Sequence, residues 1–78
     1  MKYFPVESSI LKAYGWEPGP RGSKSGLLAL QFTAGAEYWY QDVPERVLED
    51  FMMSASKGSF FRREIRPHYP GRTKPANE

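Results

Sequence analysis

Apolar side chains at every second position mark one stretch of the chain clearly as a β-strand. Leu28, Leu30 and Phe32 share one face at this spacing, while the residues between them share the other. Two further stretches are bounded by turn-forming residues and are rich in aromatic and apolar side chains. We therefore predict strands over residues 10–16, 27–32 and 37–41.

After residue 42 the apolar spacing changes to three and four, which is typical of a helix packed on a core. Pro44 fits a first helical turn, and Asp42 before it is expected to cap the exposed amides. A second helix is predicted from Ser56 to Arg66, because Pro67 opposes continuation. The apolar stripe of the first helix comprises Val43, Val47, Leu48, Phe51, Met52 and Ala55; that of the second comprises Phe60, Phe61 and Ile65.

Strands grouped before helices indicate an α+β fold. We predict a three-stranded antiparallel meander followed by two helices packed on one sheet face. Residues 33–36 suit a hairpin, whereas residues 18–26, with two prolines and three glycines, predict a mobile, irregular loop. Residues 1–72 form the predicted single domain and residues 73–78 a flexible tail. The predicted core comprises Leu28, Leu30, Phe32, Tyr38, Tyr40, Val47, Phe51, Phe61 and Ile65.

Charge is distributed unevenly along the 78 residues. Residues 1–55 carry five Lys/Arg against seven Asp/Glu, whereas residues 56–78 carry six against two. This asymmetry favours an anionic partner, although a solvated basic face explains it as well. Arginine suits phosphate through its rigid fork of donors. The residues predicted to bind nucleic acid are Lys57, Arg62, Arg63, Arg66, His68, Arg72 and Trp39.

Trp39 lies on the opposite face of its strand from Tyr38 and Tyr40, which are predicted to point into the core. We expect Trp39 on the open face of the sheet, near Trp16, Tyr14 or Gln31. Aromatic side chains on such a face can stack on nucleic-acid bases. The alternative is a protein-interaction module that uses the same exposed face around Trp39.

No catalytic or metal site is predicted. His68 is the only histidine and the chain has no cysteine, so an ordinary zinc site cannot be assembled. Ser8 and Ser9 lie in no nucleophile-elbow pattern. The turn at Ser56 opens a helix, where an anion could bind, but we interpret Ser56 as a helix cap. We therefore expect no enzymatic activity, no cofactor and no small-molecule substrate.

The chain contains no apolar run of the roughly 20 residues that span a bilayer. Its first residues, MKYFPVESSI, reach Pro5 and Glu7 before an apolar segment develops, which is unlike a signal peptide. Together with the absence of cysteine, these features predict a cytoplasmic protein without a membrane partner.

An ordered set of short motifs resembles the KTSC domain, a family named after the C-terminal region of some lysyl-tRNA synthetases. The resemblance covers about residues 6–72 and departs from the pattern in the long loop over residues 18–26. It implies a small stand-alone bacterial or phage protein with RNA as the conjectured partner and another protein as the alternative. The motif residues are Ser8, Ser9, Leu11, Tyr38, Tyr40, Val43, Pro44, Ser56, Gly58, Phe60, Phe61, Ile65 and Arg66.

Overall fold

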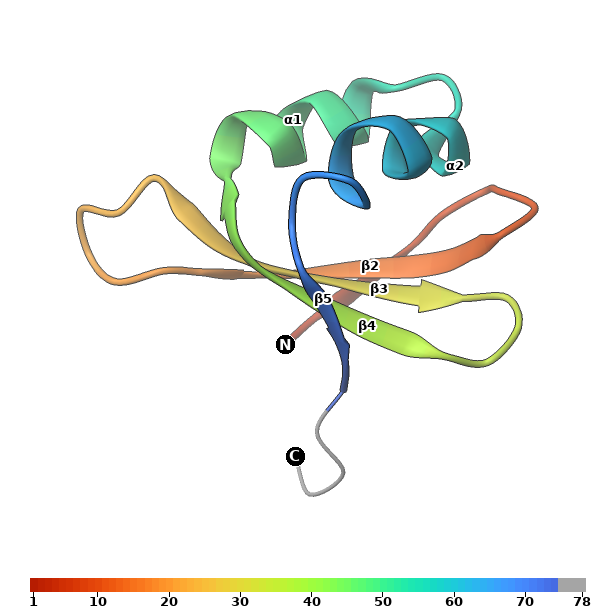
Figure 1. Cartoon of the computed structure of the whole chain (residues 1–78), viewed down its shortest axis with the longest axis horizontal. Coiled ribbons are helices and arrows are strands. Elements are labelled where there is room, and N and C mark those ends of the chain that lie inside the picture. The colour runs from red at the N-terminus through yellow and green to blue at the C-terminus, as the bar shows by residue number, and fades with distance from the viewer. Residues whose placement is uncertain (75–78) are drawn as a thin grey trace.

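A five-stranded antiparallel sheet carries all the helices on one of its faces (Figure 1). The computed structural model describes residues 1–74, and the strands follow one another across the sheet in chain order. The elements are β1 (Tyr3–Pro5), β2 (Leu11–Pro18), β3 (Ser25–Phe32), β4 (Glu37–Pro44), α1 (Glu45–Met53), α2 (Lys57–Phe60), the π-helix η1 (Phe61–Ile65) and β5 (Gly71–Thr73). The α+β class and the placement of the helices on one sheet face are confirmed.

The predicted count of three strands is wrong, because β1 and β5 extend the meander at its two edges. Each has only three residues, too few to show a period of two, and each is defined by pairing with a longer neighbour. Thr73 belongs to β5, and the backbone N–H of Lys74 donates to the carbonyl of Glu37. The sheet therefore extends past the predicted boundary at residue 72; residues 75–78 of the predicted tail lie outside the described residues.

The β2–β3 hairpin is longer than its composition suggests. Pro18 pairs with Gly26, and the N–H of Gly19 donates to the carbonyl of Ser25, so only residues 19–24 remain as a turn. The prediction that residues 18–26 are irregular is thus wrong at both ends. Gly26 is required here, because a Cβ at this position would lie 2.7 Å from Cζ2 of Trp16. Strand pairing and this close approach outweigh the turn propensity of Pro and Gly.

The core lies between the helices and one face of β2–β4. Leu28, Leu30, Phe51 and Ile65 are fully buried, as predicted, while Phe32, Tyr38 and Val47 are half-buried at its margin. Met52, predicted in the helix stripe, is 41% exposed. Edge-to-face aromatic pairs join the layers, with ring centroids 5.6 Å apart for Tyr14–Phe51 and 5.2 Å apart for Phe32–Phe61. Val43, Leu48 and Phe60, predicted in the apolar helix stripes, are also buried. Buried residues that the sequence prediction omitted are Val6, Leu11, Ala13 and Ala29.

The first helix starts without the predicted side-chain cap. Pro44 occupies the N-cap position and no side chain accepts a hydrogen bond from the first turn. Asp42 instead belongs to β4 and has a φ of 59°, a left-handed conformation that Asp tolerates better than most residues. The N–H of Glu45 donates to the carbonyl of Lys24 at 2.8 Å, so the β2–β3 turn satisfies one of the free N–H groups at the helix start.

The second helical segment changes its winding part-way. Ser56 caps α2 by accepting from the N–H of Ser59, which confirms its predicted role. From Phe61 the chain continues as a π-helix, in which the N–H of Arg66 donates to the carbonyl of Phe61 at 2.9 Å. This wider turn keeps Ile65 buried and leaves Arg66 at the end of the segment.

Candidate nucleic-acid interface

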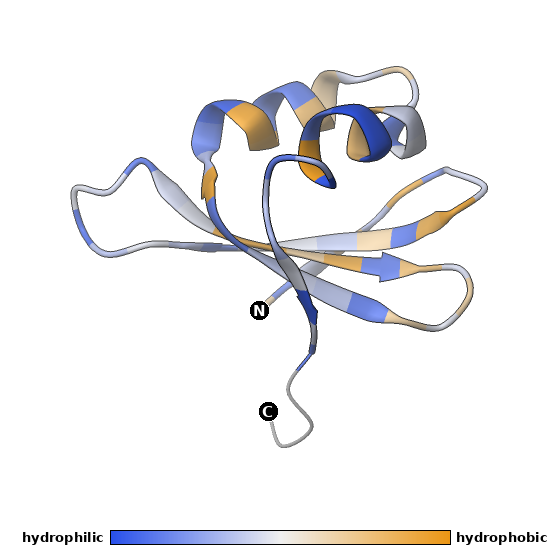
Figure 2. Ribbon diagram, viewed as in Figure 1, coloured by the Kyte–Doolittle hydropathy of each residue, from blue (hydrophilic) through white to orange (hydrophobic). Residues whose placement is uncertain are grey.

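The seven residues predicted to bind nucleic acid do not form one surface. Trp39 alternates along β4 with Tyr38 and Tyr40, which face η1, so Trp39 and its strand partner Arg72 are on the face away from the helices. The others follow the helical segment and the turn after it, on the opposite side of the sheet; they are Lys57, Arg62, Arg63, Arg66 and His68. In Figure 2, η1 contains dark blue, hydrophilic stretches next to orange ones, and β5 contains one dark blue stretch between pale ones.

Strand register fixes the neighbours of Trp39. One row of backbone partners across the sheet contains Tyr3, Gly15, Ala29, Trp39 and Arg72, so their side-chain positions share the open face. Gly15 and Ala29 are buried in the middle of this row, because Met1 and Tyr3 lie over Gly15, where a Cβ would be 2.7 Å from Sδ of Met1.

The predicted neighbours of Trp39 are partly wrong. Tyr14 and Trp16 pair with Leu30 and Leu28, which places them on the helix side of the sheet. Gln31 does share the open face with Trp39, through its pairing with Glu37. Alternation within one strand places Trp39 correctly, but the register between strands determines what surrounds it.

Glu37 holds the aromatic residues of the open face in place. One carboxylate oxygen, Oε2, accepts from the hydroxyl of Tyr3 and from Nε1 of Trp39, the latter at 2.9 Å. The other oxygen, Oε1, accepts from Nε2 of Gln31 at 3.1 Å. Because three donors from three strands converge on one carboxylate, the indole of Trp39 is oriented before any ligand binds.

The same contacts shift two ionisation equilibria. Partial burial raises the pKa of Tyr3 to about 12, and the hydrogen bond to the charged Glu37 adds to this effect. Burial also raises the pKa of Glu37, but the hydrogen bonds from Tyr3, Trp39 and Gln31, together with the charge of Lys74, outweigh it. The pKa of Glu37 is therefore lowered overall, and this carboxylate remains ionised at neutral pH.

Two cations border the aromatic residues. Arg72 is the strand partner of Trp39, and Lys74 follows it on the same face of the edge strand. A shallow depression of ≈ 340 Å³ lies beside Trp39, and its lining consists of Met1, Tyr3, Glu17, Trp39 and Lys74. Within residues 1–74 neither cation forms an ion pair with a carboxylate. We call the group Tyr3, Gln31, Glu37, Trp39, Arg72 and Lys74 the sheet-face site.

A second hollow lies on the helix side, where β3 and β4 meet η1. Its volume is ≈ 370 Å³, and we call it the aromatic pocket. Its lining consists of Phe32, Tyr38, Tyr40, Phe61 and Arg66. Burial raises the pKa of the Tyr40 hydroxyl, the neighbouring Tyr38 adds to this rise, and Arg66 opposes it.

Of the remaining predicted residues, Lys57 and Arg62 line one small polar depression together with Glu7, whereas Arg63 and His68 do not line it. Nζ of Lys57 donates to the carbonyl of Ser54 at 3.1 Å, which ties this side chain to the preceding turn. Arg63 pairs with its neighbour Glu64 at 3.4 Å. Arg62 borders a small polar depression beside Ser8, and His68 is exposed.

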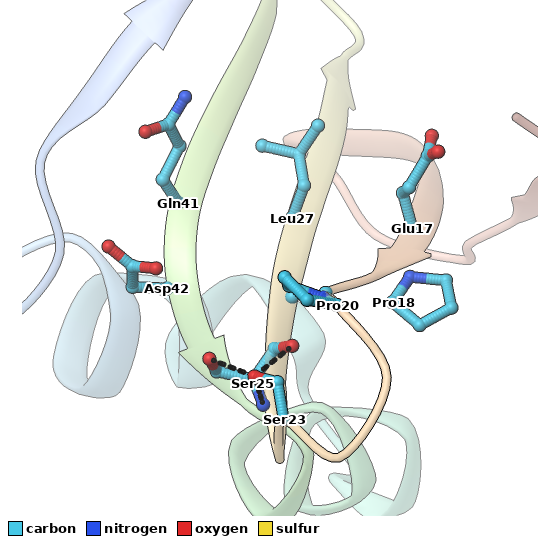
Figure 3. A pocket seen from close by; sticks show the side chains of 10 residues that line it. Glu17, Pro18, Pro20, Ser23, Ser25, Leu27, Gln41 and Asp42 are labelled. Atoms are coloured by element: carbon cyan, nitrogen blue, oxygen red, sulfur yellow. Dashed lines mark hydrogen bonds between the residues drawn. The ribbon is translucent and has the colours of Figure 1, made fainter.

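The depression beneath the β2–β3 turn does not suit an anion (Figure 3). Glu17 and Asp42 lie on either side of Leu27 and bring two carboxylates to its lining, which contains no lysine or arginine. Across the described residues, no three His, Cys, Asp or Glu side chains are grouped so that they could hold a metal ion. No helix in residues 1–74 is long and apolar enough to cross a membrane.

Comparison with known proteins identifies the family. The model of the KTSC domain matches residues 7–69. The chain belongs to the KTSC family. A crystallographically solved KTSC domain protein from Yersinia pestis has a TM-score of 0.80 and 33% identity, covering 95% of this chain and 97% of that one. The resemblance seen in the sequence is thereby confirmed.

Similar sequences occur both alone and inside a larger enzyme. A protein of Tsukamurella paurometabola is 38% identical over 65 residues, which cover 83% of this chain and 90% of that protein. A lysine–tRNA ligase of Nostoc sp. is 35% identical over 69 residues, which cover 85% of this chain but 11% of the ligase. The chain is thus similar both to most of a small protein and to a minor part of a long one.

Several residues that carry the KTSC resemblance have structural roles. The hydroxyl of Ser8 accepts from the backbone N–H of Ile10 and of Leu11, which closes the turn before β2. A Cβ on Gly58 would lie 3.1 Å from both Ile10 and Ser8, so this glycine lets α2 pack against that turn. Other motif residues, Tyr38, Tyr40, Phe61 and Arg66, meet in the aromatic pocket.

Proposed function

We propose that this KTSC domain binds single-stranded RNA with low sequence specificity, through the sheet-face site. The observation that carries the proposal is the position of Trp39. Its indole lies on the helix-free face, oriented by Glu37 and adjacent in register to Arg72. Aromatic rings stack on bases of any sequence, and neighbouring cations contact the phosphates that connect those bases.

The charge around Trp39 supports an anionic polymer over a neutral ligand. Arg72 and Lys74 form no ion pair within the described residues, and the Glu37 carboxylate between the aromatic rings already accepts three hydrogen bonds. A second carboxylate, that of Glu17, borders the depression, so the two cations are balanced only in part. The similar segment of the Nostoc lysine–tRNA ligase also supports RNA, because that enzyme's name states a tRNA substrate.

Fluorescence anisotropy with a short, labelled, single-stranded RNA tests the proposal at about 50 and 200 mM salt, a range over which phosphate contacts weaken strongly. Trp39→Ala should reduce affinity by about 1–3 kcal/mol, the usual contribution of one stacked base. Arg72→Gln with Lys74→Gln should flatten the slope of log affinity against log salt by about 0.7 for each phosphate that the protein no longer neutralises.

The matched control is Arg21→Gln with Arg46→Gln, which removes the same charge from the β2–β3 turn and from α1. This variant should retain most of the affinity and the salt slope. If the wild-type domain binds no RNA at the lower salt, the proposal fails. A protein partner on the same face around Trp39 would then be the leading function, because it requires no phosphate contact.

A further inference from the structure

The aromatic pocket has the features of a second binding site, independent of the sheet-face site. Four aromatic rings line it, and they support one another. Phe61 makes edge-to-face contacts with Phe32 and Tyr40, at centroid separations of 5.2 and 5.9 Å, and Phe32 meets Tyr38 at 5.9 Å. Rings fixed in this way are preorganised to pack against a planar, apolar group.

The polar groups of the pocket favour a ligand that carries a negative charge. Tyr38 and Tyr40 contribute hydroxyls that make no hydrogen bond to another described side chain, and Arg66 contributes a guanidinium that forms no ion pair in residues 1–74. Arg66 and Tyr40 line the same pocket, and the charge of the guanidinium opposes the rise in the pKa of the Tyr40 hydroxyl. A wholly apolar occupant would remove these donors from water without replacing their hydrogen bonds, which is unfavourable.

The fold holds these groups in position from two sides. Gly71 of β5 lies so close to Tyr40 that a Cβ would be 2.9 Å from Cζ of the ring. On the other side, the π-turn of η1 ends at Arg66, with Phe61 buried at its start. The pocket volume of ≈ 370 Å³ lies within the range of about 300–1,000 Å³ common for small-ligand sites.

We propose that the aromatic pocket binds a nucleoside monophosphate unit, with the base against the aromatic rings and the phosphate on Arg66 and the two tyrosine hydroxyls. An arginine fork and two hydroxyl donors suit the oxygens of a phosphate monoester. The unit comes either from a free nucleotide or from the 5′-phosphorylated end of an RNA. These sources share the same chemistry, and both leave the base unpaired.

Two-dimensional ¹H–¹⁵N NMR of the whole chain tests this proposal with AMP, adenosine and inorganic phosphate as separate probes. AMP should shift the amide signals of the segments that form the pocket, while adenosine and phosphate alone should bind more weakly. A short RNA with a 5′-phosphate and the same RNA with a 5′-hydroxyl distinguish the sources. Pocket shifts with AMP indicate the free nucleotide, and pocket shifts only with the 5′-phosphorylated RNA indicate a chain end; either supports the proposal.

Arg66→Met should weaken AMP binding by roughly tenfold or more, because it removes a charge-assisted hydrogen bond. Tyr38→Phe keeps the ring and should weaken binding less. The matched control is Arg62→Met, since Arg62 is exposed on the same segment but lines a different depression. Trp39→Ala should leave AMP binding unchanged, which separates this site from the sheet-face site.

Two results would overturn the proposal. One is the absence of pocket shifts with both AMP and the 5′-phosphorylated RNA. The other is an equal loss of affinity in Arg66→Met and Arg62→Met, since that would show a general charge effect. Both results would leave the proposed binding of RNA to the sheet-face site standing.

Discussion

Removal of the Glu37 carboxylate is expected to loosen the open face and lower the stability of the domain. Three donors converge on this group, from Tyr3, Gln31 and Trp39. A hydrogen bond contributes a net of about 0.5–1.5 kcal/mol to folding. Because Glu37 is half-buried and water can replace part of each bond, Glu37→Ala should cost about 1.5–3 kcal/mol in total.

Thermal unfolding followed by circular dichroism measures this loss. In a domain of this size, each kcal/mol lowers Tm by about 4–8 °C, so Glu37→Ala should lower it by roughly 6–24 °C. Glu37→Gln should cost less, because the amide oxygen can still accept from Tyr3 and Trp39. Glu49→Ala is the matched control, since Glu49 is exposed on α1 and makes no side-chain hydrogen bond within the described residues.

The pH dependence identifies the carboxylate as the cause. The pKa of Glu37 is lowered in the folded state, so its contribution is present above the ordinary value of 4.5 and is lost as pH falls through the folded pKa. Glu37→Gln should therefore reduce the acid sensitivity of unfolding. The reasoning would be refuted if Glu37→Ala unfolded at the same temperature as Glu49→Ala, or if Glu37→Gln left the acid dependence unchanged.

Three further perturbations have defined outcomes. The raised pKa of Tyr3 stabilises the folded state below pH 10, and this stabilisation is lost as pH rises to about 12. Tyr3→Phe should therefore make the melting temperature fall less over this pH range. Phe51→Ala should lower the free energy of unfolding, measured with urea, by about 3–5 kcal/mol, because Phe51 is fully buried. Met53→Ala should leave this free energy almost unchanged, because Met53 is 86% exposed. Gly71→Ala should destabilise the domain by about 1–3 kcal/mol and shift the Tyr40 amide signal in NMR, because the new Cβ meets the buried ring; an unchanged Tm would contradict this.

The spacing of apolar residues and the turn-forming residues predict the central elements of the fold, because β2–β4 and α1 are long enough to show a regular apolar spacing. The edge strands are too short for this, and they exist through pairing with β2 and β4. The sequence also does not reveal the π-turn, because Arg62 and Arg66 are four residues apart and suggest one helix face. In the structure they border different depressions.

The candidate site is predictable from the sequence only in part, because its contacts also depend on how the strands pair. Alternation along β4 places Trp39 on the open face, but its partners Tyr3 and Glu37 depend on strand register and on the pairing of β1. Tyr38 and Tyr40 are correctly predicted on the helix side of the sheet. That they leave an open pocket beside Arg66 depends on the π-turn of η1, which has no marker in the local sequence, although Pro67 marks where the helical segment ends.

The most direct test of the central proposal is NMR of the ¹⁵N-labelled domain titrated with a single-stranded RNA that carries a 5′-hydroxyl. We expect the largest shifts at the amides of β4 and β5 and at the indole N–H of Trp39, which bonds to Glu37. These shifts should weaken as salt rises, because phosphate contacts release counterions. Absence of shifts at low salt, or shifts that avoid β4, β5 and the Trp39 indole, would contradict RNA binding by the sheet-face site.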